Sequence, residues 1–197
     1  MSDTPPVRTA LYEEHLKLDA NMVDFHGFEL PIWYSNIKEE HLATRATAGL
    51  FDVSHMGSFR FSGANVRQWL ESLATQRVSS ITPSRCAYTH FLDDDGFLID
   101  DMIFAVVNET EILGVPNASM IGVMWDWFTH HLPADGSVVL ENLSEATSIV
   151  ALQGPQAQTI LDQALGEGQH AARFKWRELT EHKLGIRGRS RGPGYTG

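Results

Sequence analysis

Two strand-like segments separated by a turn constrain the fold of this chain more than any other feature. Residues 87–92 (AYTHFL) and 97–107 (FLIDDMIFAVV) are rich in β-branched and aromatic side chains. Residues 93–96 (DDDG) lie between them and have the composition of a hairpin turn. The sequence therefore predicts an antiparallel sheet built around this hairpin.

Helical and strand-like segments alternate irregularly along the rest of the chain. Helices are predicted over residues 10–21, 36–48, 64–73, 118–132 and 155–165. Further strands are predicted within 22–34, where a turn separates two of them, and over 57–63, 138–140, 148–152 and 183–190. Because no regular βαβ rhythm is present, this order predicts an α+β fold with antiparallel sheets and packed helices.

The chain is acidic, with a formal net charge of −10 over 197 residues. Binding to a nucleic-acid backbone needs clustered lysine and arginine, so we expect no nucleic-acid partner. One basic cluster is present near the C-terminal end, at Lys183, Arg187, Arg189 and Arg191. Two interpretations stay open for it: a solvated strand, or a docking patch for an acidic ligand or partner.

The single cysteine favours a reducing compartment, and hydropathy predicts no signal peptide or membrane span. Cys86 is the only cysteine, so no internal disulfide and no cysteine-based metal site can form, and we expect no metal. The N-terminal segment lacks the apolar stretch of a signal peptide. No apolar run approaches the roughly 18 residues of a membrane span. We therefore expect a cytoplasmic protein without membrane contact.

Asp100 and Asp101 are adjacent acids in the second strand of the predicted hairpin. Successive strand residues point to opposite faces, so Asp100 shares a face with Met102 and Phe104, whereas Asp101 shares the other with Ile103. Both faces are apolar, and a buried carboxylate needs donors, a cation or a proton. The pair is interpreted either as structural or as facing a ligand cavity, because perturbed acids gather at functional sites.

Other reactive side chains form no recognisable catalytic or metal motif. In residues 51–57 (FDVSHMG), Asp52, Ser54 and His55 are too close along the chain to converge easily as a triad, and no GxSxG sequence is present. We interpret Asp52 and Ser54 as bonding local backbone. The histidine pair at 130–131 lacks a partner at metal-ligand spacing. No GxGxxG or P-loop sequence supports nucleotide binding.

Six segments, in order, resemble signature sequences of one family. They are residues 22–31 (MVDFHGFELP), 39–45 (EEHLATR), 49–57 (GLFDVSHMG), 95–103 (DGFLIDDMI), 151–157 (ALQGPQA) and 194–197 (GYTG). Together they are similar to the glycine cleavage T-protein and its folate-dependent relatives. The resemblance spans nearly the whole chain, and the spacing between the segments is compatible with that of the family.

This resemblance implies a tetrahydrofolate-binding fold in which two interleaved α+β subdomains and a C-terminal β-barrel surround a folate channel. Subdomain A is expected to comprise about residues 1–52 plus 140–197, and subdomain B about residues 53–139. The family takes an aminomethyl group from the lipoylated H-protein, releases ammonia and forms 5,10-methylenetetrahydrofolate. The implied cofactor is tetrahydrofolate, and the implied partners are the H-protein and the folate itself.

The resemblance also implies functional residues at matching positions. The first Asp of the family's Ile-Asp-Asp segment is catalytic and corresponds to Asp100, which would engage the reacting nitrogens of the folate and assist proton movement. Met56, Tyr88, Asn117 and Tyr195 match positions that line the folate site. Their chemistry suits a pterin, because Met and Tyr offer apolar and stacking surface and Asn offers paired donor and acceptor groups.

Two departures from the family pattern bear on function. The chain stops at residues 194–197, where the family continues with a Glu-Asp-Gly-Phe-Glu segment and the barrel, so we expect a fragment, a truncated reading frame or a half-length module. Residues 115–125 (VPNASMIGVMW) keep Asn117 but in more apolar surroundings than usual. The alternatives are another tetrahydrofolate-dependent demethylase, acting on small amines or sulfonium compounds, or a non-catalytic folate-binding protein.

Overall fold

A computed structural model describes residues 5–179 and 188–192 of the chain. The strands are β1 (Val7–Arg8), β2 (Asn21–Phe25), β3 (Phe28–Trp33), β4 (Gly49–Asp52), β5 (Phe59–Ser62), β6 (Arg85–Leu92), β7 (Leu98–Asn108), β8 (Glu111–Val115), β9 (Val139–Asn142), β10 (Val150–Gln153), β11 (Trp176–Leu179) and β12 (Gly188–Arg191). The α-helices are α1 (Tyr12–Lys17), α2 (Ile37–Ala46), α3 (Val66–Leu73), α4 (Ile121–His130) and α5 (Ala157–Leu165). Short 3-10 helices are η1 (Val78–Ser80), η2 (Ala118–Met120) and η3 (Ser144–Ala146).

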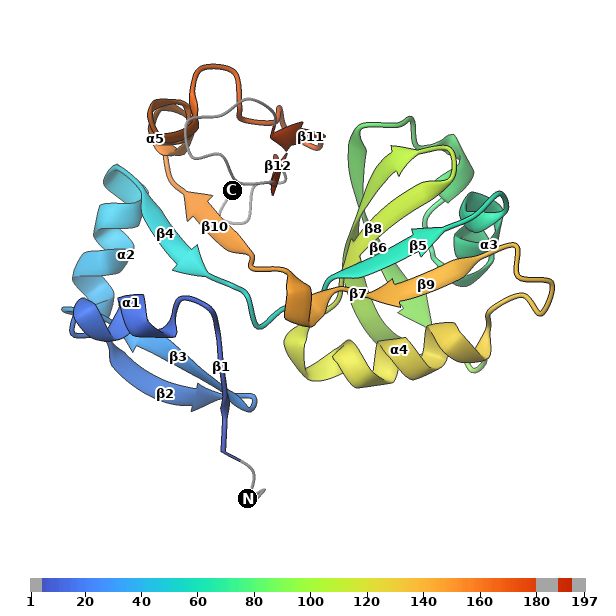
Figure 1. Ribbon diagram of the computed structural model, residues 1–197, viewed down its shortest axis with the longest axis horizontal. Helices are drawn as coiled ribbons and strands as arrows, with labels where there is room; N and C mark the ends of the chain where they lie inside the picture. The colour runs from blue at the N-terminus through green and yellow to red at the C-terminus, as the bar shows by residue number, and fades with distance from the viewer. Residues whose placement is uncertain (1–4, 180–187, 193–197) are drawn as a thin grey trace.

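The largest unit is a five-stranded antiparallel sheet in the order β6-β7-β8-β5-β9. Its longest pairing joins β6 to β7 and is the predicted hairpin, in which Gly96 adopts a φ of 84° within the turn. Gly tolerates this left-handed conformation without the steric cost that a Cβ would add. Helix α4 runs along this sheet, and α3 lies at one end of it (Figure 1).

The main core fills the space between one face of this sheet and the helices. Phe61, Phe104 and Phe128 are each 0% exposed, and Phe61 contacts both of the others, with Phe61 and Phe128 at a centroid distance of 4.9 Å in an edge-to-face arrangement. Such a geometry is favourable because the ring edge meets the negative ring face. Met124 and Phe128 are the buried residues of α4, so this helix is anchored by its apolar side.

A second group of elements contains two smaller sheets and lies beside the first group (Figure 1). One sheet has the order β1-β3-β2 and the other pairs β10 with β4 in antiparallel fashion. Helix α2 begins at Asn36, whose side chain accepts hydrogen bonds from the backbone N–H groups of Lys38 and Glu39. This is ordinary N-terminal capping, which satisfies donors that the first helical turn leaves free.

A short antiparallel ribbon of β11 and β12 is joined to the start of β6. The backbone N–H of Cys86 donates to the carbonyl of Phe174 at 2.8 Å, and that of Trp176 donates to the carbonyl of Ser84 at 3.1 Å. The indole N–H of Trp176 also reaches the carbonyl of Val106 at 2.7 Å. The ribbon therefore covers part of the sheet face opposite the main core, where Cys86 is buried.

The chain crosses between the two groups through residues 53–58 and again through residues 143–149. These crossovers are bonded to each other: the N–H of Leu143 donates to the carbonyl of Ser58 at 2.7 Å, and the N–H of Val53 donates to the carbonyl of Ile149 at 3.0 Å. The division into subdomains with boundaries near residues 53 and 140 stays a prediction.

The predicted α+β class with antiparallel sheets and packed helices is confirmed, although β1 pairs with β3 in parallel. Within residues 5–179 and 188–192, no sheet closes into a barrel. The helix predicted over 10–21 is confirmed but shorter, at Tyr12–Lys17. The sequence patterns missed β1, β4, β8 and β11. Of the strand predicted over 183–190, only the part from Gly188 lies within the described residues.

Candidate functional site

Asp100 and Asp101 lie on opposite faces of β7, as strand alternation predicted. Asp100 is 5% exposed and pairs with Phe91 on the face that carries the main core. Asp101 is half-buried and pairs with His90 on the other face. The β6–β7 register shifts between Phe91 and Leu92, next to Asp100, and such irregularities often redirect side chains beside functional sites.

Asn117 brings the two acids into one hydrogen-bonded cluster. It precedes η2, just after β8, and its Nδ2 donates to Oδ1 of Asp100 at 2.7 Å. The same Nδ2 lies 3.2 Å from the carbonyl oxygen of Asp101 and 3.4 Å from its Oδ1. An amide nitrogen carries two hydrogens, so one side chain can serve both residues. No local sequence pattern predicts this contact, because β8 and the turns on either side of it separate Asn117 from the two acids.

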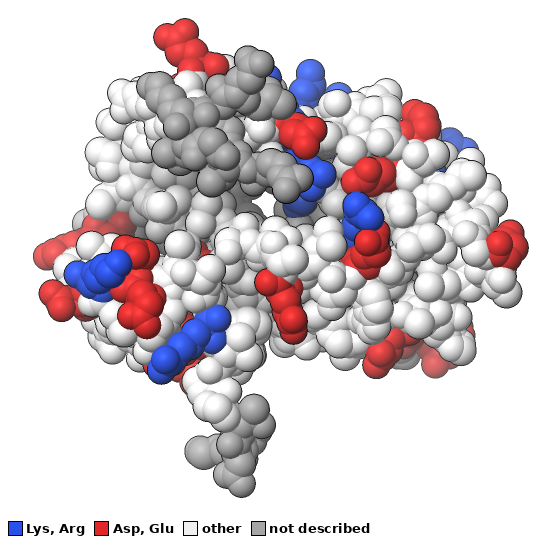
Figure 2. Space-filling view, in the orientation of Figure 1, with Lys and Arg blue, Asp and Glu red and all other residues white. Residues whose placement is uncertain are grey.

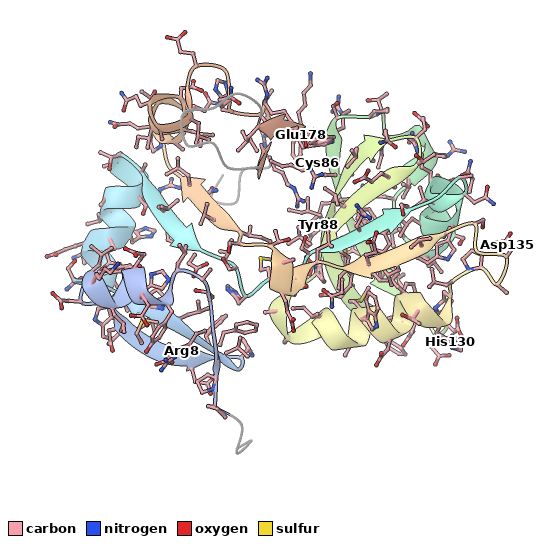
Figure 3. All side chains as sticks on the ribbon, viewed as in Figure 1. Arg8, Cys86, Tyr88, His130, Asp135 and Glu178 are labelled. Carbon is pink, nitrogen blue, oxygen red and sulfur yellow. The ribbon has the colours of Figure 1, made fainter. Side chains whose placement is uncertain are left out.

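Tyr88 on β6 joins the cluster from the side of Asp101. Its hydroxyl donates to Oδ2 of Asp101 at 2.6 Å, and its ring contacts His90 edge-on at 5.1 Å. The Tyr88 side chain is 48% exposed, so an aromatic surface is open to a ligand beside a carboxylate. Tyr88 and Cys86 both lie on the side of the sheet turned toward β10 and the β11–β12 ribbon (Figure 3).

One carboxylate oxygen of Asp100 is buried and lacks a hydrogen-bond partner among the residues that the structure describes. This atom is Oδ2, whereas Oδ1 is satisfied by Asn117. Leaving a buried acceptor unmatched costs roughly 1–3 kcal/mol, so native proteins rarely retain one without a use. The cluster therefore combines an unsatisfied buried oxygen on the core side with a partly exposed acid on the ligand-accessible side.

Met56 and Asn117 are brought close by the end of the first crossover. The N–H of Gly57 donates to the carbonyl of Pro116 at 3.0 Å. A Cβ at Gly57 would lie 2.5 Å from Cγ of Pro116, so only glycine permits this approach without displacement. Met56 itself is half-buried. Tyr195, the remaining predicted folate-site residue, lies outside the described residues.

The residues of the FDVSHMG segment do not form a catalytic triad. Asp52 bonds the backbone N–H of Ser54 at 2.9 Å, as predicted, but its histidine partner is His15 at 3.0 Å rather than His55. His55 packs edge-on against Phe25, and burial lowers the pKa of its imidazole against the attraction of Asp52. No sequence pattern links His15 to Asp52, so this pair could not be found before the fold was known.

Neither the histidine pair at 130–131 nor any other group supports a metal site in the described part of the chain. His131 contacts the carbonyl of Trp127 through Nδ1 at 2.7 Å, as expected for a side chain at a helix end. Across residues 5–179 and 188–192, no three His, Cys, Asp or Glu side chains gather as metal ligands. On the face in Figure 2, acidic and basic side chains are interspersed and no basic expanse is seen.

The structure is an α+β scaffold that places a buried carboxylate and a half-buried carboxylate beside an exposed tyrosine. Comparison with known proteins identifies its family. The family model described as the GCVT N-terminal domain matches residues 11–197. The chain therefore belongs to the GCVT N-terminal domain family. In the described part of the chain, no helix has the length and apolar character needed to cross a membrane.

Curated relatives and a solved structure agree with this assignment. The chain is 40% identical over 153 residues to an aminomethyltransferase of Chloroherpeton thalassium, a match that covers 78% of the chain and 42% of the relative. It is 41% identical over 154 residues to the aminomethyltransferase of Bacillus subtilis, covering 78% and 42%. The crystal structure of glycine cleavage system aminomethyltransferase T from Bartonella henselae superposes with a TM-score of 0.82 at 28% identity, covering 89% of this chain and 48% of that one. The chain thus spans about half the length of the relatives it matches.

Proposed function

We propose that this chain contributes the folate-binding part of an aminomethyltransferase of the glycine cleavage system. In this role it takes an aminomethyl group from the lipoylated H-protein, releases ammonia and forms 5,10-methylenetetrahydrofolate. The names of the relatives support the general activity. The single observation that carries the proposal is the cluster in which Asn117 bonds Asp100 beside Asp101, with Tyr88 exposed next to it.

The side chains of this cluster fit a folate. Tetrahydrofolate supplies the nitrogens that accept the one-carbon unit. The exposed ring of Tyr88 offers a stacking face for a flat heterocycle, and Met56 offers adaptable apolar surface. The carboxylates of Asp100 and Asp101 can accept hydrogen bonds from ring N–H groups and stabilise positive charge that develops there. A carboxylate in such an environment can also accept a proton released during transfer.

Two assignments of the catalytic carboxylate follow from different observations. Sequence resemblance supports Asp100, and its unmatched buried Oδ2 is consistent with a group reserved for the reaction. Side-chain direction supports Asp101, which shares its face with exposed Tyr88 and is more accessible than Asp100. We propose Asp100 as the catalytic residue and keep Asp101 as the direct competitor, because the cluster joins both through Asn117.

The apolar surroundings of Asn117 have a structural explanation. Met120, Ile121 and Trp125 pack against the main core, and Trp125 meets the ring of Phe59 at 5.7 Å. Their apolar character therefore serves the attachment of α4 to the sheet. This packing removes the main sequence argument for a demethylase acting on other small amines or sulfonium compounds, so the aminomethyltransferase proposal is preferred.

A transfer assay tests the proposal. The purified chain is incubated with aminomethylated, lipoylated H-protein and tetrahydrofolate, and ammonia and 5,10-methylenetetrahydrofolate are quantified together. Equal amounts of both products are expected. The Asp100→Asn variant should lose at least about 100-fold in rate while retaining tetrahydrofolate affinity, since general acid–base groups contribute this much. Asp101→Asn is the matched control. A loss in Asp101→Asn alone would transfer the catalytic role to Asp101, and folate binding without products would favour a non-catalytic folate-binding protein.

A further inference from the structure

Asp52 is a buried acid outside the proposed folate site, at the end of β4. Its side chain is 0% exposed. Oδ2 accepts hydrogen bonds from the hydroxyl of Thr9 at 2.6 Å and from Nε2 of His15 at 3.0 Å, and Oδ1 accepts one from the backbone N–H of Ser54 at 2.9 Å. Both carboxylate oxygens are thus held by donors from three separate segments, which fixes the direction of the chain as it leaves β4.

His15 is itself fixed from its other side. It is 5% exposed, and its Nδ1 lies 2.8 Å from the hydroxyl of Tyr34. A neutral imidazole protonated on Nε2 donates to Asp52 and accepts from Tyr34, so both ring nitrogens are satisfied. The Asp52–His15 pair therefore links α1 and the segment after β3 to the start of the crossover at residues 53–58.

Immediately after Asp52, the crossover at residues 53–58 is hydrogen-bonded to the crossover at residues 143–149. The hydroxyl of Ser54 donates to the carbonyl of Ile149 at 3.2 Å and accepts from the N–H of Ile149 at 3.1 Å. The N–H of Val53 reaches the same carbonyl at 3.0 Å. Because Asp52 accepts a hydrogen bond from the N–H of Ser54, it orients Ser54 for its hydrogen bonds to Ile149 in the crossover at residues 143–149.

The other end of the same crossover carries the proposed site. The N–H of Met56 closes a turn onto the carbonyl of Val53 at 3.0 Å, and Gly57 bonds the carbonyl of Pro116, the residue before Asn117. Only four residues lie between Asp52 and Gly57, and the backbone N–H groups of Val53, Met56 and Gly57 are all hydrogen-bonded. The segment that could absorb a change in direction at Asp52 before Met56 and the contact to Pro116 is therefore short and hydrogen-bonded.

We propose that Asp52, held by His15, is a positioning residue for the folate site: it sets the path of residues 53–58 and thereby the placement of Met56 and Asn117. The identity of the ligand in this statement rests on the proposed function. The positioning role itself rests on the hydrogen bonds that join Asp52 to Ser54 and Gly57 to Pro116. Contacts alone do not demonstrate coupling between Asp52 and the folate site, so a change at Asp52 must be shown to alter Met56 or Asn117.

The test compares two variants that each remove a buried polar interaction. Asp52→Asn replaces an oxygen that accepts bonds with an amide nitrogen that cannot accept them. Arg67→Lys is the matched control, because Arg67 is 6% exposed, holds the carbonyls of Val78 and Ile81, and belongs to α3 at the end of the sheet away from the crossover (Figure 1). For each full chain, urea unfolding gives stability, calorimetric titration gives tetrahydrofolate affinity, and hydrogen exchange reports the amides of Met56 and Gly57.

Both variants should lose stability, but only Asp52→Asn should weaken tetrahydrofolate binding, by about tenfold, as expected for a disturbed set of buried hydrogen bonds. His15→Gln, which retains one N–H donor, should restore part of the affinity that His15→Ala loses. If the unmutated chain binds no tetrahydrofolate, the proposed function fails. Hydrogen exchange then still tests whether Asp52 positions residues 53–58. The amides of Met56 and Gly57 should then exchange faster in Asp52→Asn than in Arg67→Lys. Equal exchange in the two variants, or equal affinity in the two variants of a chain that does bind tetrahydrofolate, would overturn the positioning role.

Discussion

The side-chain amide of Asn117 donates to the carboxylate of Asp100 across 2.7 Å, and this contact joins the segment just after β8 to the first part of β7, the longest strand described. Asp100 is buried, so the contact supplies a donor that water cannot replace. It also places the amide beside Asp101. The arrangement of the proposed site therefore depends on this one amide as much as on either acid.

Replacement of Asn117 by Leu should destabilise the chain. Both oxygens of Asp100 would then be buried without a donor among the described residues, which costs about 1–3 kcal/mol. The free energy of unfolding in urea measures this loss. Asn21→Leu serves as the control, because Asn21 is exposed and a surface change stays within about 0.5 kcal/mol. Equal losses in the two variants would show that the Asn117 bond contributes nothing.

Replacement of Gly57 by Ala should displace the segment that carries Asn117. The new Cβ would lie 2.5 Å from Cγ of Pro116 and 2.9 Å from Cγ1 of Ile121, so one of these groups must shift. Overpacking of this kind costs about 1–3 kcal/mol. Thermal unfolding reports the cost, and Gly122→Ala is a suitable control because a Cβ there meets nothing within 4 Å. Unchanged stability of Gly57→Ala would mean that the close approach to Pro116 is not required.

The contribution of Asp52 to stability should depend on pH. Burial raises the pKa of the Asp52 carboxyl, but hydrogen bonds from Ser54, Thr9 and His15 outweigh it and leave the folded-state pKa below the ordinary value. The ionised form is therefore favoured by folding. The resulting stability is present above the ordinary Asp pKa of about 3.9 and is lost as pH falls through the folded-state pKa.

Unfolding free energies of the unmutated chain and of Asp52→Asn, measured from neutral pH down into the acid range, test this dependence. The difference between the two should be largest near neutrality and should shrink below about pH 4, where the unfolded carboxyl takes up a proton. A difference that stays constant, or grows as pH falls, would contradict the direction of the pKa change.

Removal of the Phe128 ring should cost more than any surface substitution. Phe128 is 0% exposed and contacts Phe59, Phe61 and Phe91 within the main core. Phe→Ala in a core costs about 3–5 kcal/mol through lost burial and the cavity that remains. Phe97→Ala is the matched control, because Phe97 is 72% exposed. Comparable unfolding free energies for both variants would contradict the position of the core.

The fold could be predicted from sequence where its signals were local. The β6–β7 hairpin followed from two segments rich in β-branched and aromatic residues around a glycine-containing turn, and the cap at Asn36 followed from residue type. Strand β4 was not predicted, because its four residues show no alternation of apolar and polar side chains. Its partner β10 also lies about 100 positions further along the chain. Strand pairing at that separation is decided by tertiary packing rather than by local preference.

Sequence patterns and the family resemblance named the residues of the candidate site, which stay predictions, but could not give the hydrogen bonds between them. Strand alternation correctly separated Asp100 from Asp101, and the structure adds that Asn117 reaches both. The partner of Asp52 could not be predicted, because His15 lies in a six-residue helix with no motif around it. Whether Asp100 or Asp101 carries the reaction stays a prediction, since the family pattern and the side-chain directions favour different residues.

Calorimetric titration of tetrahydrofolate into the purified chain tests the central claim most directly. We predict saturable binding at one site, with a dissociation constant below about 1 mM, the upper end of typical substrate affinities for enzymes. Asn117→Ala and Tyr88→Ala should each weaken it by about tenfold or more, because each removes a hydrogen-bonding or stacking group from the cluster. No saturable binding by the unmutated chain, or binding that neither substitution alters, would contradict the assignment of the folate site to this cluster.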